Sequence, residues 1–565
     1  MDKFRDIFYK KQRITYCIAA LIGAAAFVAV YGVRVLNPIY DEWLLGRGDL
    51  TQHYLGWCFY RMGKWIFPIG LTDRLAYPNQ TSIIFTDSIP LFAVPFKLIS
   101  PILPHTFQYF GWWGLVSFML QGVLACMILT ELHIDSFCAL AGSMLFVLSP
   151  VVIEKMFRHT SLGAHWMVLL SIYFFIRHRH IYQDLRKTLI CWGIMGGLVG
   201  AVHMYYLPMC GMLAIGFAAA SVFRERKFYV RYMIPVGAFL AGAGGMTYVL
   251  GGFSTKVTAD ADGLGLYGFN LNSFWNAKGY SRWLPSLEMY HEGQYEGFAY
   301  LGIGVYLFLV FALVYIVWSL VEICLKRRRF SRNSRIYLGI CVVMMLGLTV
   351  FAASPQVSFG SRLLFVLTDS STITHYWSIF RASGRVIWPA YYLIDIGAIV
   401  CYDRFWHSFC RGKHTATVLF AVCIFLQIFD IGNKLAMQRQ AFAYERAYET
   451  PLKSAVWEEL AGRESIEHIV WVSHNLDYGP IMDFAKYAYD NGWTMNNYYF
   501  ARAVNVNETT RQSMQHLNDS CIYLFKTDEK EYLAGNMEDF DLNYYEADGY
   551  IVGTVFQIEH AVPLR

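Results

Sequence analysis

Charge is scarce in this chain, and that scarcity excludes an ordinary soluble protein. Only 16% of its 565 residues are Asp, Glu, Lys or Arg, whereas 56% are hydrophobic and 17% are aromatic. Soluble domains carry about 25% charged residues. Several apolar runs approach or exceed the roughly 20 residues that cross about 30 Å of hydrocarbon. The composition therefore indicates an α-helical polytopic membrane protein.

The sequence also lacks the cysteine spacings that are typical of disulfide-bonded or metal-binding proteins. Most of the 12 cysteines lie in apolar runs or in loops predicted to be cytoplasmic, and only Cys58 and Cys521 fall clearly outside. Their separation forms neither a disulfide framework nor a metal-binding motif. The acidic stretch 260–263 predicts a turn, because it lacks the glycine and the glutamate that a calcium-binding loop requires. No repeat or low-complexity segment is present.

The apolar runs predict about eleven membrane spans. The first, at 15–36, follows three basic residues, lacks a small-residue cleavage site and is long for a signal-peptide core. It therefore indicates a retained signal anchor with a cytoplasmic N-terminus. The other spans are expected near 106–130, 138–152, 164–176, 188–204, 206–222, 232–252, 299–324, 336–353, 386–402 and 415–431.

One further apolar stretch, 88–103, is predicted to be an interfacial or re-entrant helix. It contains two prolines and a lysine, which disfavour a full span.

Basic loops set the expected orientation. Four loops are rich in Lys and Arg, and the positive-inside rule places them in the cytoplasm: 177–187, 224–231, 326–335 and 404–413. This leaves residues 432–565 outside the cytoplasmic (inner) membrane. That tail holds 11 basic and 20 acidic residues although the whole chain carries +5. We interpret the asymmetry as membrane orientation and not as nucleic-acid binding.

The tail predicts a small α/β domain. Apolar runs at 467–473, 521–525 and 550–558 are typical of strands, and 481–490 is typical of an amphipathic helix. The tail has no Gly-rich phosphate loop and no convincing nucleophile arrangement, so we expect an accessory or acceptor-positioning domain. The chain thus divides into a membrane domain, 1–431, and an extracytoplasmic domain, 432–565.

The first outer loop, 37–105, is the richest in ionisable residues. Asp49 precedes a stretch of helical periodicity and is expected either to cap that amphipathic helix or to serve in chemistry. His53, Arg61 and Asp87 share the same membrane surface. A carboxylate beside a bilayer must be solvated, paired or functional. This loop is therefore the first candidate for an active site.

Short polar and aromatic motifs lie along the whole membrane part: Gly48-Asp49 with Gln52-His53-Tyr54-Leu55-Gly56-Trp57, 85–91 (Phe-Thr-Asp-Ser-Ile-Pro-Leu), 107–111 (Phe-Gln-Tyr-Phe-Gly), 148–150 (Leu-Ser-Pro), Arg158-His159 with His165-Trp166, 296–302 (Glu-Gly-Phe-Ala-Tyr-Leu-Gly) and 381–385 (Arg-Ala-Ser-Gly-Arg). This arrangement resembles the GT-C superfamily of integral membrane glycosyltransferases. It is more closely similar to a bacterial family of polytopic membrane proteins grouped with that superfamily.

The resemblance implies a GT-C-like fold and an inverting glycosyl transfer at the outer face of the membrane. The donor would be a polyprenyl-phosphate sugar, and the acceptor a cell-envelope glycan or lipid. A carboxylate, Asp49 or Asp87, would take the proton from the acceptor hydroxyl. Substrate-binding residues would be His53, Arg61, Arg158, His159, His165, Glu296, Arg381 and Arg385. No metal ligand is assigned, and the need for a divalent cation stays open.

Each of these residues has a simpler interpretation. Arg381 and Arg385, four residues apart, would share a helical face and bind phosphate, or would anchor lipid headgroups at the interface. His159 and His165 are alternatively structural histidines, and Asp87 is alternatively a turn or helix cap. The aromatic loop 253–298 is a sugar or lipid lid, or an ordinary membrane anchor.

Three other functions remain open. A transporter or lipid flippase usually needs ionisable groups deep in the membrane. Only His203 and Asp395 are expected at such depth here, which favours chemistry at the interface. A polymerase or ligase of lipid-linked glycans would share the location and the phosphate-binding arginines. A non-catalytic envelope scaffold is the third alternative.

Overall fold

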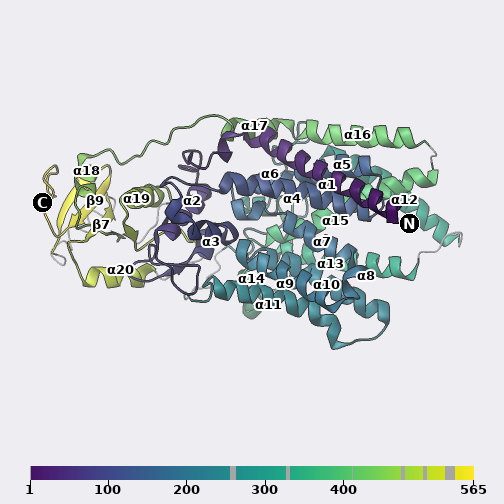
Figure 1. The fold of residues 1–565 in the computed structure, drawn as a ribbon, viewed down its shortest axis with the longest axis horizontal. Helices are drawn as coiled ribbons and strands as arrows, with labels where there is room; N and C mark the ends of the chain where they lie inside the picture. The colour runs from purple at the N-terminus through teal and green to yellow at the C-terminus, as the bar shows by residue number, and fades with distance from the viewer. Residues whose placement is uncertain are drawn as a thin grey trace.

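The computed structural model describes residues 2–254, 263–325, 331–409, 412–472, 478–500, 506–527 and 541–564. Long helices lie side by side in one bundle, and a small sheet lies beyond one end of that bundle (Figure 1). Most of the acidic stretch 260–263, predicted to be a turn, falls outside the described residues.

The membrane part contains α1 (Asp2–Tyr31), α2 (Asp49–Met62), α3 (Pro90–Leu98), α4 (Phe110–Glu131), α5 (Ser136–Val147), α6 (Pro150–Lys155), α7 (Trp166–Ile176), α8 (His178–Tyr182), α9 (Leu185–Val202), α10 (Tyr206–Glu225), α11 (Ile234–Val249), α12 (Ile303–Cys324), α13 (Arg332–Ala353), α14 (Ser371–Ser378), α15 (Trp388–Phe409), α16 (Lys413–Asp430) and α17 (Gly432–Phe442). Between them lie 3-10 turns: η1 (Arg34–Leu36), η2 (Ile83–Thr86), η3 (Ser100–Ile102), η4 (Thr160–Gly163), η5 (Val230–Met233), η6 (Glu292–Gly297) and η7 (Ser383–Ile387). Two short hairpins, β1–β2 (Leu71–Thr72, Thr81–Ser82) and β3–β4 (Gln356–Phe359, Arg362–Val366), complete this part.

Nine helices in the described part of the chain are long and apolar enough to cross a membrane, and a bent pair raises the number to ten. The expected eleven is therefore slightly too high. The run at 164–176 forms the 11-residue α7, which at 1.5 Å per residue is about 16 Å long and too short to span. The run at 415–431 forms α16, which bends by 52° into α17. The predicted re-entrant stretch forms the nine-residue α3 and also cannot span.

Helices α9 and α11 pack closely because glycines line their contact. A Cβ on Gly196 would lie 1.9 Å from the carbonyl oxygen of Phe239, and one on Gly242 would lie 2.2 Å from that of Gly193. Small residues let backbones approach in this way where no hydrophobic effect drives helices together. The two helices consequently pack backbone against backbone along the middle of their length.

Helix α2 differs from the amphipathic interfacial helix that the sequence predicts. Every residue from Leu50 to Tyr60 is buried. Helix α2 contacts α3, η2 and β1 of the membrane part and α19 of the tail (Figure 1). Because both parts of the chain cover α2, the helix lies inside the protein, and its polar residues are buried together with its apolar ones.

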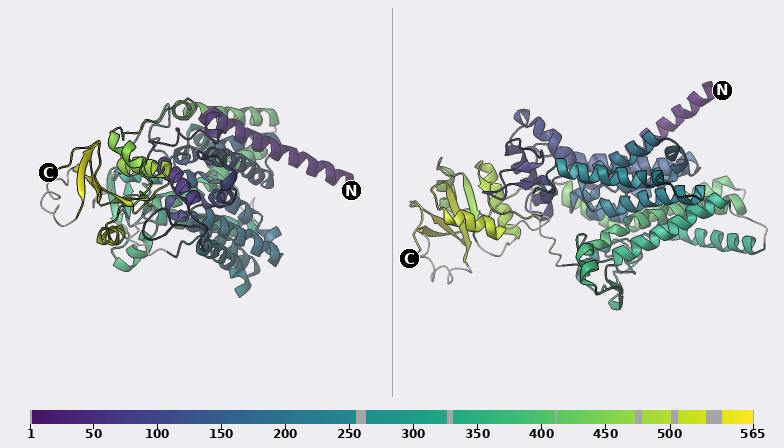
Figure 2. Two further views of the ribbon diagram at one scale, coloured as in Figure 1. Left: turned by 60° about the vertical axis from the view of Figure 1, so that its left-hand side comes forward. Right: turned by 90° about the horizontal axis from the view of Figure 1, so that it is seen from below.

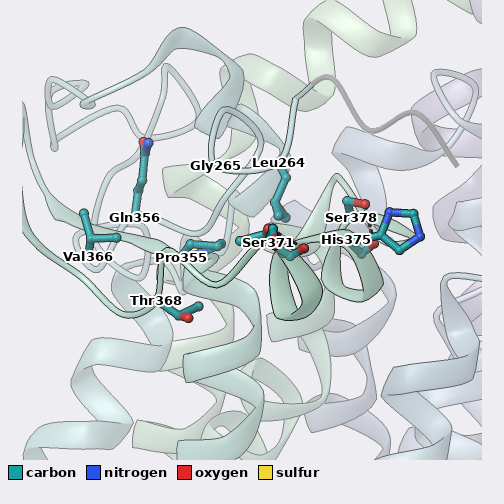
Figure 3. A pocket seen from close by; sticks show the side chains of 10 residues that line it. Leu264, Gly265, Pro355, Gln356, Val366, Thr368, Ser371, His375 and Ser378 are labelled. Atoms are coloured by element: carbon teal, nitrogen blue, oxygen red, sulfur yellow. Dashed lines mark hydrogen bonds between the residues drawn. The ribbon is translucent and has the colours of Figure 1, made fainter.

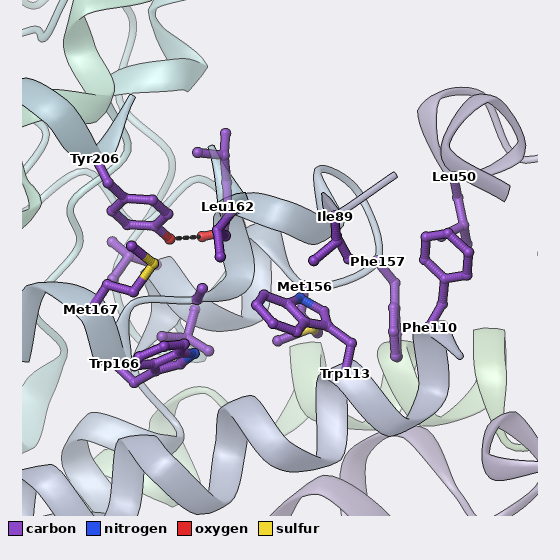
Figure 4. Close-up of a cluster of buried hydrophobic side chains, with 14 of the residues drawn as sticks. Leu50, Ile89, Phe110, Trp113, Met156, Phe157, Leu162, Trp166, Met167 and Tyr206 are labelled. Carbon is purple, nitrogen blue, oxygen red and sulfur yellow. Dashed lines mark hydrogen bonds between the residues drawn. The ribbon is translucent and has the colours of Figure 1, made fainter. Parts of the chain in front are cut away.

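A cluster of buried apolar side chains packs against helix α2. Leu50, Phe110, Trp113, Phe157 and Trp166 come from α2, α4, the loop after α6 and α7, and their side chains gather in one layer (Figure 4). The hydroxyl of Tyr206 donates a 2.8 Å hydrogen bond to the Leu162 carbonyl within the same cluster. These contacts fix the loops above the membrane helices.

The tail folds as an α/β unit, as its apolar pattern predicts. Its helices are α18 (Ala455–Ala461), α19 (Tyr478–Asp490) and α20 (Val506–Gln515), and its strands are β5 (His468–Trp471), β6 (Thr494–Met495), β7 (Cys521–Lys526), β8 (Asn543–Ala547) and β9 (Tyr550–Thr554). The strand order is β6-β5-β7-β9-β8. β5 runs parallel to β6 and β7, whereas β9 runs antiparallel to β7 and β8.

The tail docks on the first outer loop (Figure 2). The amide of Met495 donates to the Arg74 carbonyl at 3.0 Å, and the Met495 carbonyl accepts from the Tyr77 amide at 2.9 Å. The Tyr489 hydroxyl donates to the His105 carbonyl at 2.8 Å. These bonds join the tail to the loop that carries the candidate site.

We predict that Gly196→Ala destabilises the protein by about 1–3 kcal/mol, as overpacking typically does. Its Cβ would collide with a backbone carbonyl, so α9 and α11 would have to separate. Gly197→Ala on the same helix is the matched control, because the nearest atom would lie 4.0 Å from a Cβ at that position. Thermal unfolding in detergent compares the two variants. Equal unfolding temperatures would contradict the packing described here.

Candidate functional site

Two carboxylates of the first outer loop lie at the tail-facing end of the bundle. Asp49 is the first residue of α2 and follows Gly48, whose combination of φ 58° and ψ −130° is readily adopted only by glycine. Asp87 follows η2 and itself has a φ of 54°. The turn at Gly48 and the turn at Asp87 thus bring both acids to one region.

His159 connects Asp49 to a second acidic residue. Its Nδ1 lies 2.9 Å from Asp49 Oδ2, and its Nε2 lies 3.2 Å from Glu296 Oε1. The Asp49 side chain is 30% exposed, whereas that of Glu296 is 3% exposed. His159 therefore orients the partly exposed Asp49 carboxylate through one ring nitrogen, and the buried Glu296 carboxylate orients His159 through the other.

Glu296 is the centre of a buried ion-pair network. Arg385 binds it with two nitrogens, Nη2 to Oε1 at 2.7 Å and Nε to Oε2 at 2.8 Å, and Lys155 Nζ lies 2.5 Å from Oε2. Burial alone raises the pKa of Glu296, but the charges of Arg385 and Lys155 outweigh it and hold that pKa well below its ordinary range. Glu296 is therefore ionised, and it orients both cations.

Asp87 occupies a more enclosed position than Asp49. Its Oδ1 lies 3.4 Å from His203 Nε2, and its Oδ2 lies 4.0 Å from His53 Nε2. Burial raises the pKa of Asp87 to about 6 despite the opposing charges of His159 and Arg385. The nearby charge of Asp49 raises it further.

His53 is neutral in this setting. It is fully buried, and burial lowers its pKa to about 3. Its Nδ1 lies 3.3 Å from the Thr160 hydroxyl. Its Nε2 has no hydrogen-bond partner among the described residues and faces Asp87.

The tail contributes to the site through Tyr498 and Tyr499. The Gln52 amide donates to the Tyr499 carbonyl at 2.7 Å, and the Tyr498 hydroxyl donates to the Gln52 carbonyl. Burial raises the pKa of the half-buried Tyr499 phenol, and the carboxylates of Asp49 and Asp87 raise it further. The charges of both acids therefore act on this phenol.

Arg381 and Arg158 lie at the edges of the site. Arg381 is half-buried, and its side chain lies near Gly263. Its positive charge lowers the pKa of Tyr499 and so opposes the effect of the two carboxylates. Arg381 forms no ion pair with the part of the chain that the structure describes. Arg158 pairs with Glu154 and lies 4.6 Å above the Tyr295 ring.

Two predicted site residues lie in other contacts. Arg61 donates to the carbonyls of Pro104 and His105 at 3.0 and 2.9 Å and thereby holds the loop before α4. His165 is buried, with Nδ1 at 2.8 Å from the Tyr392 hydroxyl and its ring 4.2 Å from that of Trp388. The structure thus places neither beside Asp49 or Asp87.

A polar cavity of about 460 Å³ lies between the loop at 264–265, the β3–β4 segment and helix α14 (Figure 3). Gln356 lines one side of it, and Ser371, His375 and Ser378 line another from helix α14. Gly265 also lines it next to Gln356, two residues after Gly263, which lies near the Arg381 side chain.

Sequence reasoning missed three residues of the site. Lys155 ends an apolar run, and Tyr499 belongs to the tail. His203 was expected deep in the membrane, but it directly follows α9, where the chain leaves the helix in an extended conformation toward Asp87. No sequence signal pairs these residues with Glu296, Asp49 or Asp87. Across the described ranges, no group of three or more His, Cys, Asp or Glu side chains is arranged to hold a metal ion.

A family model described as a domain of unknown function, DUF6311, matches residues 20–432. The chain belongs to the DUF6311 family. The model of the DUF6311 C-terminal domain matches residues 456–555. No curated protein matches the chain.

Solved structures of two other proteins are similar to this DUF6311 chain. The oligosaccharyltransferase AglB from Archaeoglobus fulgidus, in complex with an inhibitory peptide and a dolichol-phosphate, is 11% identical, with a TM-score of 0.47 over 97% of this chain and 76% of that one. ArnT from Cupriavidus metallidurans, bound to undecaprenyl phosphate, is 11% identical, with a TM-score of 0.43 over 98% and 99%. Likenesses at this level support no conclusion about activity.

We predict that Glu296→Gln destabilises the protein by about 3–5 kcal/mol, because it leaves Arg385 and Lys155 buried without a counter-charge. The double variant Glu296→Gln/Lys155→Met should recover part of this loss, since it removes one uncompensated charge. Glu292→Gln, an exposed residue of the same η6 turn, is the control. Thermal unfolding measures all three. A Glu296→Gln protein as stable as the control would contradict the network's role.

Proposed function

We propose that this DUF6311 chain is an inverting membrane glycosyltransferase of the GT-C type. It would transfer a sugar from a polyprenyl-phosphate donor to a cell-envelope glycan or lipid on the outer face of the cytoplasmic membrane. The observation that carries the proposal is the pair Asp49 and Asp87, placed with histidines and cations at one end of a membrane bundle. The motif resemblance to GT-C enzymes supports the same reaction class.

The reaction needs a carboxylate that can reach an acceptor hydroxyl. In our proposal Asp49 takes the hydroxyl proton, the acceptor oxygen bonds to the anomeric carbon, and the bond from that carbon to the lipid phosphate breaks. The leaving phosphate keeps the electron pair, and the configuration inverts. Asp49 suits this role because it is partly exposed and His159 fixes its orientation. Asp87, with a pKa near 6, is the competing base.

The leaving phosphate needs a cation. Arg385 is committed to Glu296 by two hydrogen bonds, so it contributes charge without turning toward the substrate. Arg381 has no carboxylate partner in the described part of the chain and is the better phosphate ligand. We propose that Arg381 contacts the donor phosphate and that Arg385 strengthens the local positive field.

Apolar surface for a lipid tail lies on the same side of the molecule. All five residues of β4 are exposed, and Leu364 and Phe365 are each about half exposed. A strand exposed over its whole length and rich in Leu and Phe favours contact with hydrocarbon over contact with water. The polyprenyl tail or the surrounding lipid would cover it.

A transporter or flippase is the second candidate, and one observation favours it. Asp395 in α15 is buried, and neither of its carboxylate oxygens has a hydrogen-bond partner among the described residues. Unpaired acids inside a bundle often mark ion pathways. A radiolabelled sugar-transfer assay with a panel of polyprenyl-phosphate sugars separates the two, because only a transferase forms a labelled glycan.

We predict that Asp49→Asn folds normally and reduces transfer by about 10²–10⁴-fold, the usual contribution of a general base. The structure places Gly48, not Asp49, at the N-cap of α2, so a loss of activity in Asp49→Asn would not come from a lost helix cap. The assay uses the donor identified in the panel. Asp87→Asn should lose less activity. Full activity of Asp49→Asn with a large loss in Asp87→Asn would assign the base to Asp87.

We predict that Arg381→Ala weakens donor binding about tenfold or more, since a charge-assisted hydrogen bond contributes about 1.5–3 kcal/mol. Arg34→Ala is the control, because Arg34 is an exposed arginine after α1 that pairs with Glu445 and lies outside the proposed donor-binding residues. Binding is measured by titration of the lipid-linked donor. Unchanged affinity in Arg381→Ala would remove this arginine from the phosphate site.

A further inference from the structure

A second cavity lies at the opposite end of the bundle from Asp49. Helix α10 ends at Glu225, and Arg226 follows in a left-handed conformation with a φ of 55°. The chain then turns toward η5 and enters α11, close to the first turn of α13. This turn lies at the end of the bundle far from the tail sheet (Figure 1).

The cavity, which we call the basic cavity, measures about 470 Å³ and combines charge with apolar surface. Its cationic residues are Arg226, Lys227 and Arg332, and its apolar wall includes Phe223 and Ile336. None of the described residues that line it is a carboxylate. Two helices thus supply the wall, and the turn between α10 and η5 supplies two of the three cations.

None of the three cations forms an ion pair with a carboxylate in the described segments of the chain. Arg332 uses Nη2 to donate to the Phe223 carbonyl at 2.8 Å, which fixes its side chain at the cavity wall. The N-terminus of α13, where Arg332 lies, adds the positive end of a helix dipole. The cavity therefore carries a net positive charge that a ligand would balance.

The apolar wall selects among anionic ligands. Phe223 is 59% exposed and Phe228 is 65% exposed, although both are large and hydrophobic. A small soluble anion would gain nothing from this surface, whereas an acyl chain would cover it. Negative headgroups are attracted to clustered Lys and Arg at a membrane surface. The charge and the apolar wall together match an amphipathic anion.

We propose that the basic cavity binds an anionic phospholipid. The headgroup phosphate contacts Arg226, Lys227 and Arg332, and an acyl chain lies along Phe223 and Ile336. The positive-inside pattern predicts that this end faces the cytoplasm. The lipid thus binds on the leaflet opposite to the proposed catalytic site, and the proposal stands independently of the transferase activity.

The test uses the full chain in neutral detergent, titrated with dioleoyl-phosphatidylglycerol or dioleoyl-phosphatidylcholine, with bound lipids counted by native mass spectrometry. We expect the wild type to prefer phosphatidylglycerol. The variant Arg226→Gln/Lys227→Gln/Arg332→Gln should lose that preference by roughly fivefold per charge, on the order of 100-fold in total. The control Arg179→Gln/Arg186→Gln/Arg404→Gln removes three exposed charges from the same end but none from the cavity.

Three outcomes would overturn the proposal. Retained preference in the cavity variant would show that the cavity does not bind the lipid. An equal loss in the control variant would show that general surface charge, and not the cavity, attracts it. Displacement of phosphatidylglycerol by the same concentration of glycerol phosphate would show that the acyl chain contributes nothing. Loss confined to the cavity variant, with no displacement by glycerol phosphate, supports the assignment.

Discussion

The geometry of the candidate site depends on one buried carboxylate. Glu296 lies on η6, and it receives Arg385 from η7 and Lys155 from the end of α6. His159, in the loop after α6, bridges it to Asp49. Buried ion pairs add little net stability, because desolvation offsets their attraction. Their effect here is geometric, because three segments far apart in the chain (155–159, η6 and η7) meet at one carboxylate. His159 then orients Asp49.

The sequence predicts which residues belong to this site better than it predicts which of them contact one another. Asp49, Asp87, His159 and Glu296 are recognisable because polar residues are rare in an apolar chain and these lie in short motifs beside predicted spans. Helices are equally visible, since long apolar runs have few alternatives in a bilayer. The pairing of Arg385 with Glu296 is not visible, because periodicity relates neighbours on one helix and says nothing about residues 89 positions apart.

The residues that sequence reasoning missed share one physical cause. Lys155 and His203 stand at the ends of apolar helices, where a single polar residue is equally compatible with an interfacial anchor or with part of the span. Burial decides between these interpretations, and burial is set by which loops fold over the helix end. The tail residue Tyr499 was missed for the same reason, since no pattern in the tail indicates that it docks on α2.

The docking of the tail is part of the site's construction. Helix α2 is buried along its length, and the face that the tail covers would be exposed if the tail were absent. Gln52 illustrates this, because its side-chain amide and its carbonyl are bonded to Tyr499 and Tyr498 respectively. A buried amide without partners costs about 1–3 kcal/mol. The tail therefore completes the hydrogen bonding of the helix that carries Asp49, and it does so through the residue pair Tyr498 and Tyr499.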